Sequence, residues 1–402
     1  MTSVDADVIV AGGGPAGAAT ATRLARLGWE VLLFDKARFP REKPCAEFLS
    51  PGAVAQLHEV DILDAVQATS PARLEGMRIE ADQATCDIRY TQPDGTHGAM
   101  GIQRPVLDSI LLEQARSQGV RVCEGTVVLG SLGEQGRVHG VIVRQGTSGC
   151  REVQARFVVG ADGPHSRIAG SLGLNRSARW PRRLGLTARY AGDFPATGFG
   201  TMVVGSDSYC GLAPLGHGLL NVGLVIPLGA HNSSEPVATL FERQIRGLPG
   251  VRSRLGTAER VTDIRGSGPL AHSVRRVAGP GYVLVGDAAG FLDPFTGEGI
   301  FRALRGAELA AHVIDAALRE GQEATATVAR AYRHARTRAF QDKERLCWLV
   351  QLFLTQRPLF SYILRRLHSR PNLRAVLAGA LGDFGPAASA LSPAFLSSLL
   401  RP

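Results

Sequence analysis

A glycine-rich turn between a short apolar run and a helical segment constrains the fold of this chain more than any other feature. The run Asp7-Val8-Ile9-Val10-Ala11 is apolar after its first residue and largely β-branched, which is typical of a buried parallel strand. The turn Gly12-Gly13-Gly14-Pro15-Ala16-Gly17 follows, and good helix formers extend from Ala18 to Leu27. A second strand is expected over residues 30–34, with Asp35 at its end. This order of elements predicts a Rossmann-type α/β unit that binds a dinucleotide.

Each glycine of this turn has its own physical task. Gly12 permits a tight turn, Gly14 lets the backbone approach a pyrophosphate, and Gly17 lets the helix pack against the strand. The free N–H groups and the positive dipole at the start of the helix would face the phosphates. Asp35 lies at a spacing that suits a carboxylate on a ribose hydroxyl. The motif alone does not choose between FAD and NAD.

Two later strands also end at an aspartate. Residues 156–161 lead into Asp162-Gly163, a pair that is also common in ordinary turns. Residues 281–285 lead into Gly286-Asp287, which suits contact with a ribityl hydroxyl. A helix is expected from Gly299 to Ala316, with alanines that permit close packing. Its N-terminus would suit the pyrimidine edge of a flavin, where negative charge develops on reduction.

Together these motifs resemble those of the flavoprotein superfamily that contains the aromatic hydroxylases, the flavin halogenases and the geranylgeranyl reductases. The resemblance extends from about residue 5 to residue 316. Within the superfamily, Lys43-Pro44-Cys45 and the stretch from Gly286 to Ile300 are most similar to the geranylgeranyl reductases. The hydroxylases usually have a His and a Gly-Gln-Gly where this chain has Gly290 and Gly297-Glu298-Gly299.

The resemblance implies FAD. We expect it to bind without a covalent link, because the motif regions contain no His or Cys whose placement demands one, although Cys45 is a near candidate. The residues expected to contact FAD are Gly12, Gly14, Pro15, Ala16, Gly17, Asp35, Lys36, Cys45, Arg104, Val127, Asp162, Gly163, Gly286, Asp287, Pro294, Gly297, Gly299 and Ile300. For Arg104, the alternative is a solvated side chain that caps a helix starting near Asp108. Val127 would present its backbone to the adenine.

Three residues are candidates for a catalytic role: Cys45, Glu47 and Tyr209. Cys45 would lie beside the isoalloxazine, or it would only fill a turn. Glu47 and His217 are titratable and near this region, but nothing in the sequence proves that either one transfers a proton. No metal site is expected.

Residues 180–275 interrupt the nucleotide-binding pattern, and alternating runs such as 219–226 predict an inserted antiparallel β-sheet that binds substrate. Geranylgeranyl reductases carry a Y-x-W-x-F-P motif there. This chain has Tyr209-Cys210-Gly211-Leu212-Ala213-Pro214. The substrate pocket is therefore expected at Tyr209, Gly211, Ala213 and Pro214, and the two missing aromatics predict a substrate bulkier than a single isoprenoid chain. The halogenase motif W-x-W-x-I-P is absent, which argues against halogenation.

The expected domains follow from these segments. The FAD-binding domain covers 1–179, with a sheet insertion over 71–105, and resumes over 276–337. The substrate sheet covers 180–275, and residues 338–402 form a helical C-terminus with apolar residues at helical spacing, Leu346 to Leu354. Nearby arginines, Arg365, Arg366, Arg370 and Arg374, belong either to a helical cap on the core or to a basic amphipathic surface that contacts a membrane.

Composition narrows the possible partners and the compartment. The net charge is +9, but the chain has no arm of consecutive Lys or Arg and no zinc-finger spacing, so no nucleic acid is expected. Six separated cysteines predict reduced thiols. The acidic N-terminus is unlike a signal peptide, and no apolar run predicts a transmembrane segment. A cytoplasmic protein is expected, with peripheral membrane contact as an addition.

The predicted function is redox chemistry on an apolar or polycyclic small molecule, with electrons from NAD(P)H or a redox partner. By resemblance, the reaction is reduction of a carbon–carbon double bond. The alternative is hydroxylation through a flavin hydroperoxide. A halogenase is less expected because its motif is absent. A non-catalytic FAD-binding protein is least expected, because a helix directed at the pyrimidine edge serves reduction of the ring.

Overall fold

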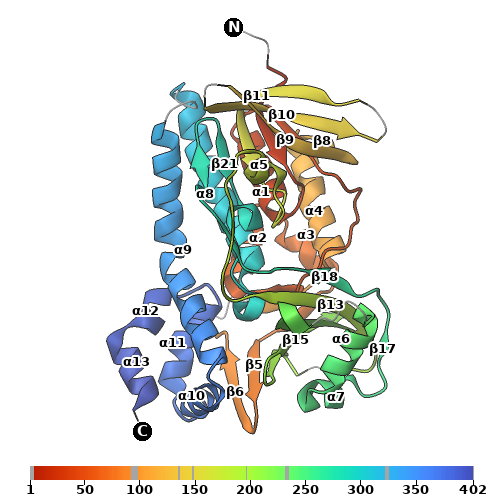
Figure 1. The fold of residues 1–402 in the computed structure, drawn as a ribbon, viewed down its shortest axis with the longest axis vertical. Coiled ribbons are helices and arrows are strands. Elements are labelled where there is room, and N and C mark those ends of the chain that lie inside the picture. Colours follow the sequence, from red (N-terminus) through yellow and green to blue (C-terminus); the bar gives the residue numbers. More distant parts are fainter. Residues whose placement is uncertain are drawn as a thin grey trace.

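The structure, a computed structural model, describes residues 4–91, 98–134, 136–146, 149–195, 197–230, 235–321 and 326–401. Figure 1 shows a first sheet with its helices at one end of the molecule, a second sheet at the other end, and a group of C-terminal helices beside the second sheet. The expected fold class, an α/β protein with an inserted sheet and a helical C-terminus, is confirmed.

The first sheet has a parallel centre. Its strand β1 (Ala6–Ala11) is almost completely buried and pairs in parallel on both sides, which explains its continuous apolar sequence. Its two neighbours are β11 (Arg151–Gly160) and β2 (Val31–Phe34). Next to these lie two more parallel strands, β21 (Tyr282–Leu284) beside β11 and β8 (Arg121–Cys123) beside β2. Antiparallel strands extend it: β9 (Thr126–Glu134), β10 (Arg137–Gln145) and β20 (Ala278–Gly279).

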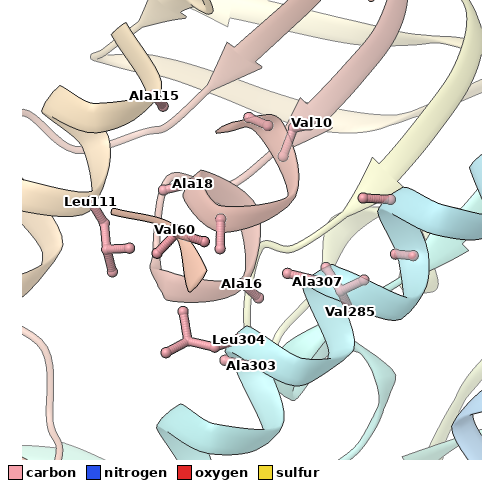
Figure 2. Packing of buried hydrophobic residues seen from close by; sticks show 14 of the residues in the cluster. Val10, Ala16, Ala18, Val60, Leu111, Ala115, Val285, Ala303, Leu304 and Ala307 are labelled. Carbon is pink, nitrogen blue, oxygen red and sulfur yellow. The ribbon is translucent and has the colours of Figure 1, made fainter. Parts of the chain in front are cut away.

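Three helices pack together on one face of this sheet: α1 (Pro15–Arg26), α4 (Arg104–Ser117) and α8 (Gly299–Arg319). Helix α1 begins at Pro15, before the expected start, because proline suits the first turn of a helix. Figure 2 shows Ala16 of α1 beside Ala303 and Ala307 of α8, and all three are buried. Small side chains at this contact let the two helices approach closely.

The second sheet has the strand order β17-β13-β16-β15-β14-β5-β6, with β18 beside β13. Its strands are β5 (Gly76–Ala81), β6 (Ala84–Arg89), β13 (Arg183–Ala191), β14 (Phe199–Val204), β15 (Tyr209–Gly216), β16 (Leu219–Pro227), β17 (Glu259–Arg260) and β18 (Arg265–Ser267). The β5–β6 hairpin comes from the insertion over 71–105. We expected an antiparallel sheet, but strand β5 runs parallel to β14. This parallel pair is possible because the two strands come from separate parts of the chain.

The outer face of the second sheet is covered by two helices that the sequence interpretation missed, α6 (Val237–Arg246) and α7 (Pro249–Leu255). Leu240, Phe241 and Ile245 of α6 are buried against the apolar outward face of the sheet. Side chains alternate along a strand, so the opposite face is left for the functional site.

The C-terminal helices are α9 (Ala326–Leu354), α10 (Arg357–Ser369), α11 (Pro371–Leu381), α12 (Ala387–Leu391) and α13 (Pro393–Leu400). Helix α9 crosses the boundary expected at residue 338 and extends from the first sheet toward the second (Figure 1). Helices α10 and α11 pack on the β5–β6 hairpin, α10 through buried residues such as Leu364 and Leu367. Among the helices in the described ranges, none is both long and apolar enough to cross a bilayer.

Small elements connect these layers. The helices are α2 (Pro51–Glu59), α3 (Leu63–Ala68) and α5 (Arg167–Ser171), with 3-10 turns at Leu228–Ala230, Gly286–Ala289 and Pro294–Thr296. A three-stranded sheet is made of β3 (Phe48–Leu49), β7 (Ala99–Gly101) and β4 (Ala72–Leu74), and β12 (Asn175–Ser177) pairs with β19 (His272–Val274).

Candidate cofactor and active site

The three strand-end motifs, far apart in the sequence, meet at one place. A Cβ atom added at Gly12 would lie 2.4 Å from the carbonyl oxygen of Ala161, next to Asp162. A Cβ atom added at Gly286 would lie 2.8 Å from the Cβ of Ala16. The carboxyl ends of β1, β11 and β21 therefore converge around the start of α1, which is where an open α/β sheet binds its ligand.

The three glycines of the turn have different surroundings. Gly12 takes a φ of +103°, and a Cβ atom at Gly17 would lie 1.8 Å from the carbonyl oxygen of Gly12. Both positions are thus closed by backbone. At Gly14, the only atom within 4 Å of an added Cβ is a guanidinium nitrogen of Arg41, at 3.3 Å. Gly14 therefore leaves space beside a cation at the N-terminus of α1, as a pyrophosphate requires.

Asp35 ties the turn to the end of β2. Its carboxylate is buried and accepts hydrogen bonds from the N–H of Gly13 (2.7 Å) and the N–H of Ala37 (2.8 Å). A carboxylate has about four acceptor positions, so Asp35 keeps the capacity to bind a ribose hydroxyl. Lys36, which follows it, is exposed, and Val127 lies in β9.

Positive charge gathers between the motifs. The Nζ of Lys43 would lie 3.4 Å from a Cβ atom at Gly163, which has a φ of +83°. Burial lowers the pKa of the Lys43 ammonium, and the nearby Asp287 carboxylate opposes this shift. With Arg41 beside Gly14, two cations thus line the junction of the motifs, where a dianionic pyrophosphate would be stabilised.

Arg104 is not the solvated arginine that the alternative interpretation expected. It is buried, and its Nε and Nη2 donate to the carboxylate of Asp108 at 2.8 and 2.7 Å. Burial alone would lower the pKa of the guanidinium, but Asp108 raises it overall. Helix α4 begins at Arg104 rather than near Asp108, because Pro105 suits its first turn.

Asp162 supplies an unused acceptor. Its Oδ2 accepts the N–H of Arg167 at 2.6 Å at the start of α5. Its Oδ1 is buried and has no hydrogen-bond partner within the described part of the chain. Burial raises the pKa of this carboxyl group. A buried acceptor without a partner is costly, so a donor such as a cofactor hydroxyl fits this position. The open space at Gly14, the two cations and this acceptor together fit FAD.

The candidate residue Glu47 is fixed by the second sheet. It has a φ of +56° and is buried. Its Oε2 accepts the Nε of Arg189 at 2.8 Å, and its Oε1 accepts the N–H of Arg104 at 2.7 Å. Arg189, on β13, also holds Glu42 through two bonds of 2.9 Å. Because both Glu47 oxygens are engaged, the geometry favours a positioning role over proton transfer.

Cys45 lies on the same loop as Glu47, facing β16. Its sulfur accepts the N–H of Glu47 at 3.3 Å, and its carbonyl oxygen accepts the side-chain amide of Asn221 at 2.9 Å. A small polar pocket opens here, partly to solvent, and is lined by Lys43, Cys45, Asn221 and charged residues of β13 and β18. The structure therefore places Cys45 between the loop and the second sheet.

Tyr209 lies in a buried polar cluster. Its hydroxyl donates to Asp293, whose carboxylate also pairs with Arg183 at 3.0 Å. Burial, and then Asp293, raises the pKa of Tyr209 well above its usual value, so the hydroxyl stays protonated at neutral pH. The ring packs edge-on against Phe295, next to Pro294. This joins the second sheet to the segment that precedes α8.

The inner face of the second sheet has a flat centre. Gly211 of β15 pairs with Gly223 of β16, and Met202 and Thr187 lie on either side in the same row. A Cβ atom at Gly211 would meet only ordinary contacts, the nearest being Met202 Cε at 3.5 Å. Tyr209 and Ala213 share this face by alternation. Pro214 falls on the opposite face, so it does not line the same wall as the other three predicted pocket residues.

His217 lies away from these groups. It is exposed in the turn between β15 and β16, has a φ of +52°, and contacts the carbonyl oxygen of Thr69 through Nε2 at 3.2 Å. A turn that requires positive φ explains its backbone, and its position gives no support for proton transfer.

A buried charge cluster joins the start of α8 to the C-terminal helices. Lys343 of α9 donates to Asp383 at 2.7 Å and lies 3.7 Å from the Oε2 of Glu298, which caps α8. Glu298 Oε1 also accepts the thiol of Cys347 at 3.1 Å. Burial raises the pKa of the Asp383 carboxyl, and Lys343 opposes this. The cluster thus fixes the Gly297-Glu298-Gly299 segment.

We expect Lys343→Met to lower the free energy of unfolding by about 3–5 kcal/mol at neutral pH, because two buried carboxylates lose their cation. The pKa of Asp383 should then rise further. The folded state of the variant would then bind more protons than its unfolded state. The loss in free energy of unfolding should therefore shrink as the pH falls from neutral through the raised pKa of Asp383. Arg345→Met is the matched control on α9, since Arg345 and its partner Asp342 are exposed, and it should cost under about 1 kcal/mol. Denaturant unfolding measures both, and equal costs would contradict the prediction.

The sequence interpretation missed Arg41, Lys43 as a charge, Arg189, Asn221 and Asp293. A signal existed for Arg189. It lies between apolar Ala188 and Tyr190, which pack on the outer helices, so strand alternation turns the arginine toward the inner face. For Asn221 and Asp293 the sequence offered only isolated polar residues, and their partners lie far along the chain.

Comparisons with known proteins agree with this geometry. The chain matches the FAD binding domain family model over residues 5–345. It is 30% identical over 342 residues to the menaquinone reductase of Mycobacterium tuberculosis, covering 78% of each chain. It is 29% identical to digeranylgeranylglycerophospholipid reductase 1 of Methanothermobacter thermautotrophicus, covering 79% of each.

Among solved structures, a geranylgeranyl bacteriochlorophyll reductase-like protein from Thermoplasma acidophilum superposes with a TM-score of 0.79. The identity is 24%, and 93% of this chain and 96% of that chain are covered. At this identity the likeness concerns the fold alone. The expected resemblance to the aromatic hydroxylase and geranylgeranyl reductase superfamily is confirmed. The chain belongs to the FAD-binding domain family, and it is an FAD-dependent oxidoreductase.

Proposed function

We propose that this protein binds FAD without a covalent link and reduces a carbon–carbon double bond in a lipophilic small molecule. The observation that carries the proposal is the inner wall of the second sheet. Its centre is the flat Gly211–Gly223 pair, bordered by apolar Met202 and Val225 and by the ring of Tyr209. Such a wall suits an apolar substrate. The two relatives carry the names of reductases that act on menaquinone and on a geranylgeranyl lipid, which supports the same class.

When bound, FAD supplies the hydride chemistry, and the residues of this chain bind and orient. Arg41, Lys43 and the α1 N-terminus would hold the pyrophosphate, and Asp35 and Asp162 would accept cofactor hydroxyls. Asn221 and Arg189 fix the loop that carries Cys45 against the second sheet. Reduction consumes electrons that NAD(P)H or a redox partner would deliver.

The cofactor proposal predicts a yellow protein that releases its colour on denaturation. Acid precipitation should leave FAD in the supernatant, because no residue at the described site requires a covalent bond to it. Chromatography of the supernatant separates FAD from FMN. Recovery of FMN alone, or colour retained in the protein pellet, would contradict the proposal.

Product mass distinguishes reduction from oxygenation. The FAD-loaded protein is reduced anaerobically and mixed with a lipid extract rich in menaquinones and geranylgeranyl lipids. Reduction of a carbon–carbon double bond predicts reoxidation of the flavin without oxygen and a lipid that still carries two extra hydrogen atoms after air has returned any quinol to the quinone. A product that gains an oxygen atom, formed only in air, would instead establish hydroxylation. Reoxidation that no lipid fraction accelerates would contradict reductase activity on this class.

A further inference from the structure

Two tryptophans lie stacked on the surface near the second sheet. Trp180 precedes β13 and Trp348 lies on α9, and their rings are 5.6 Å apart at an interplanar angle of 26°. Their exposed fractions are 41% and 45%. Leu352, one turn further along α9, is 55% exposed. In Figure 1 the chain enters β13 beside the lower half of α9. These three residues form one exposed apolar surface, here called the Trp180–Trp348 surface.

The surroundings of this surface are strongly basic. No acidic residue occurs in the sequence between Asp162 and Asp193. Three exposed arginines lie close to Trp180 in the sequence: Arg176, Arg179 and Arg182. Two more, Arg275 and Arg276, follow β19 and lie beside the start of β12, at the end of that strand away from Trp180. Among the described residues, none of these five has an ion-pair partner. Their charge is therefore available to a partner outside the chain.

The chemistry of the surface selects its occupant. A second copy of this chain would bring two unpaired basic clusters together, which is unfavourable. An anionic bilayer offers both complements: phosphate groups for the arginines and an interfacial zone that tryptophan prefers. We propose that the Trp180–Trp348 surface docks this protein peripherally on an anionic membrane, with both indoles at the headgroup level and Leu352 reaching the acyl boundary.

This surface lies close to the proposed substrate wall. Arg183, which follows Trp180 closely, bonds to Gln351 of α9 at 2.6 Å and to Asp293 at 3.0 Å. Asp293 in turn accepts the hydroxyl of Tyr209. A short chain of contacts therefore links the docking residues to the inner face of the second sheet. The idea that the membrane supplies substrate rests on the proposed function, but docking itself is measured without substrate.

Docking can be measured by co-sedimentation of the FAD-loaded protein with vesicles. The vesicles are phosphatidylcholine alone, or phosphatidylcholine with about a third phosphatidylglycerol. We expect binding to the anionic vesicles that weakens with added salt. Removing both rings in Trp180→Ala/Trp348→Ala should weaken partitioning roughly tenfold or more. Arg179→Gln/Arg182→Gln should weaken it by roughly fivefold for each charge removed.

Two control variants remove the same kinds of side chain, one apolar and one charged, outside the Trp180–Trp348 surface. Leu27→Ser removes an exposed apolar side chain after α1, and Arg252→Gln removes an exposed charge on α7. Both should bind vesicles as the unchanged protein does, and all variants should retain FAD. If the tryptophan variant binds anionic vesicles normally, the proposal fails. It also fails if the tryptophan variant loses a concentration-dependent self-association that the unchanged protein shows, because the Trp180–Trp348 surface would then join two copies of the chain. Binding of an acidic protein to this surface, without binding to anionic vesicles, would contradict it as well. None of these outcomes depends on whether the protein reduces a double bond.

Discussion

An alanine at Gly17 should leave the purified protein colourless. The added Cβ atom would lie 1.8 Å from the carbonyl oxygen of Gly12, which belongs to backbone that cannot swing aside. Helix α1 would have to move away from β1, taking with it the N–H groups that face the pyrophosphate. We expect FAD affinity to fall by at least about a hundredfold, since several phosphate contacts are lost together. Fluorescence titration of the deflavinated protein with FAD measures this.

Gly17→Ala can also fail by unfolding, so Gly14→Ala separates binding from folding. At Gly14 an added Cβ meets only the end of the flexible Arg41 side chain, at 3.3 Å, so the fold should survive. The methyl group would still occupy the space needed by the pyrophosphate, and FAD should bind about tenfold or more weakly. Gly28→Ala is the control outside the site. Its φ of +92° costs about 1–2 kcal/mol, yet nothing lies within 4 Å and FAD binding should not change. Equal FAD affinities for the Gly14 and Gly28 variants would contradict a phosphate site at this turn.

The nucleotide-binding half of the fold was predictable because its determinants are local. A strand, a glycine turn and a helix N-terminus lie within about thirty residues, and each glycine carries its own steric requirement. The meeting of Gly12 with Ala161 and of Gly286 with Ala16 follows once three parallel strands end at one sheet edge. The sequence thus predicted that the three motifs meet at one sheet edge, as well as the motifs themselves.

The second sheet and its polar contacts were harder to predict from the sequence. Strand β5 joins β14 although their sequences are far apart, and alternation says which face a residue takes but not which strand lies beside it. Arg189 with Glu47, and Tyr209 with Asp293, are pairs of this kind. Helices α6 and α7 were missed because they lie within a segment dominated by strands, although Leu240, Phe241 and Ile245 of α6 fall at helical spacing.

Tryptophan at Gly211 should reduce turnover by about a hundredfold or more while leaving FAD bound, if the inner wall of the second sheet holds the substrate. A tryptophan side chain covers about 150–250 Å², enough to fill the flat centre formed with Gly223. Tightly packed sites tolerate little overfilling, so substrate and indole would compete for the same space. Product formation from the lipid fraction and the flavin absorbance measure the two properties separately.

The backbone conformation at Gly211 means that the substitution tests the volume of the side chain and not backbone strain. Gly211 does not take a positive φ, so a side chain there carries no conformational penalty of the kind that Gly12 would impose. Gly211→Ala should therefore retain nearly full turnover, because its Cβ would make only ordinary contacts with Met202. Gly229→Trp controls for the indole itself, because this exposed position has no described residue within 4 Å of an added Cβ. If Gly211→Ala lowers turnover as much as Gly211→Trp does, side-chain volume at this wall does not explain the loss. If Gly211→Trp turns over normally, the substrate does not lie against this face, and the missing aromatics at positions 211 and 213 have no bearing on its size.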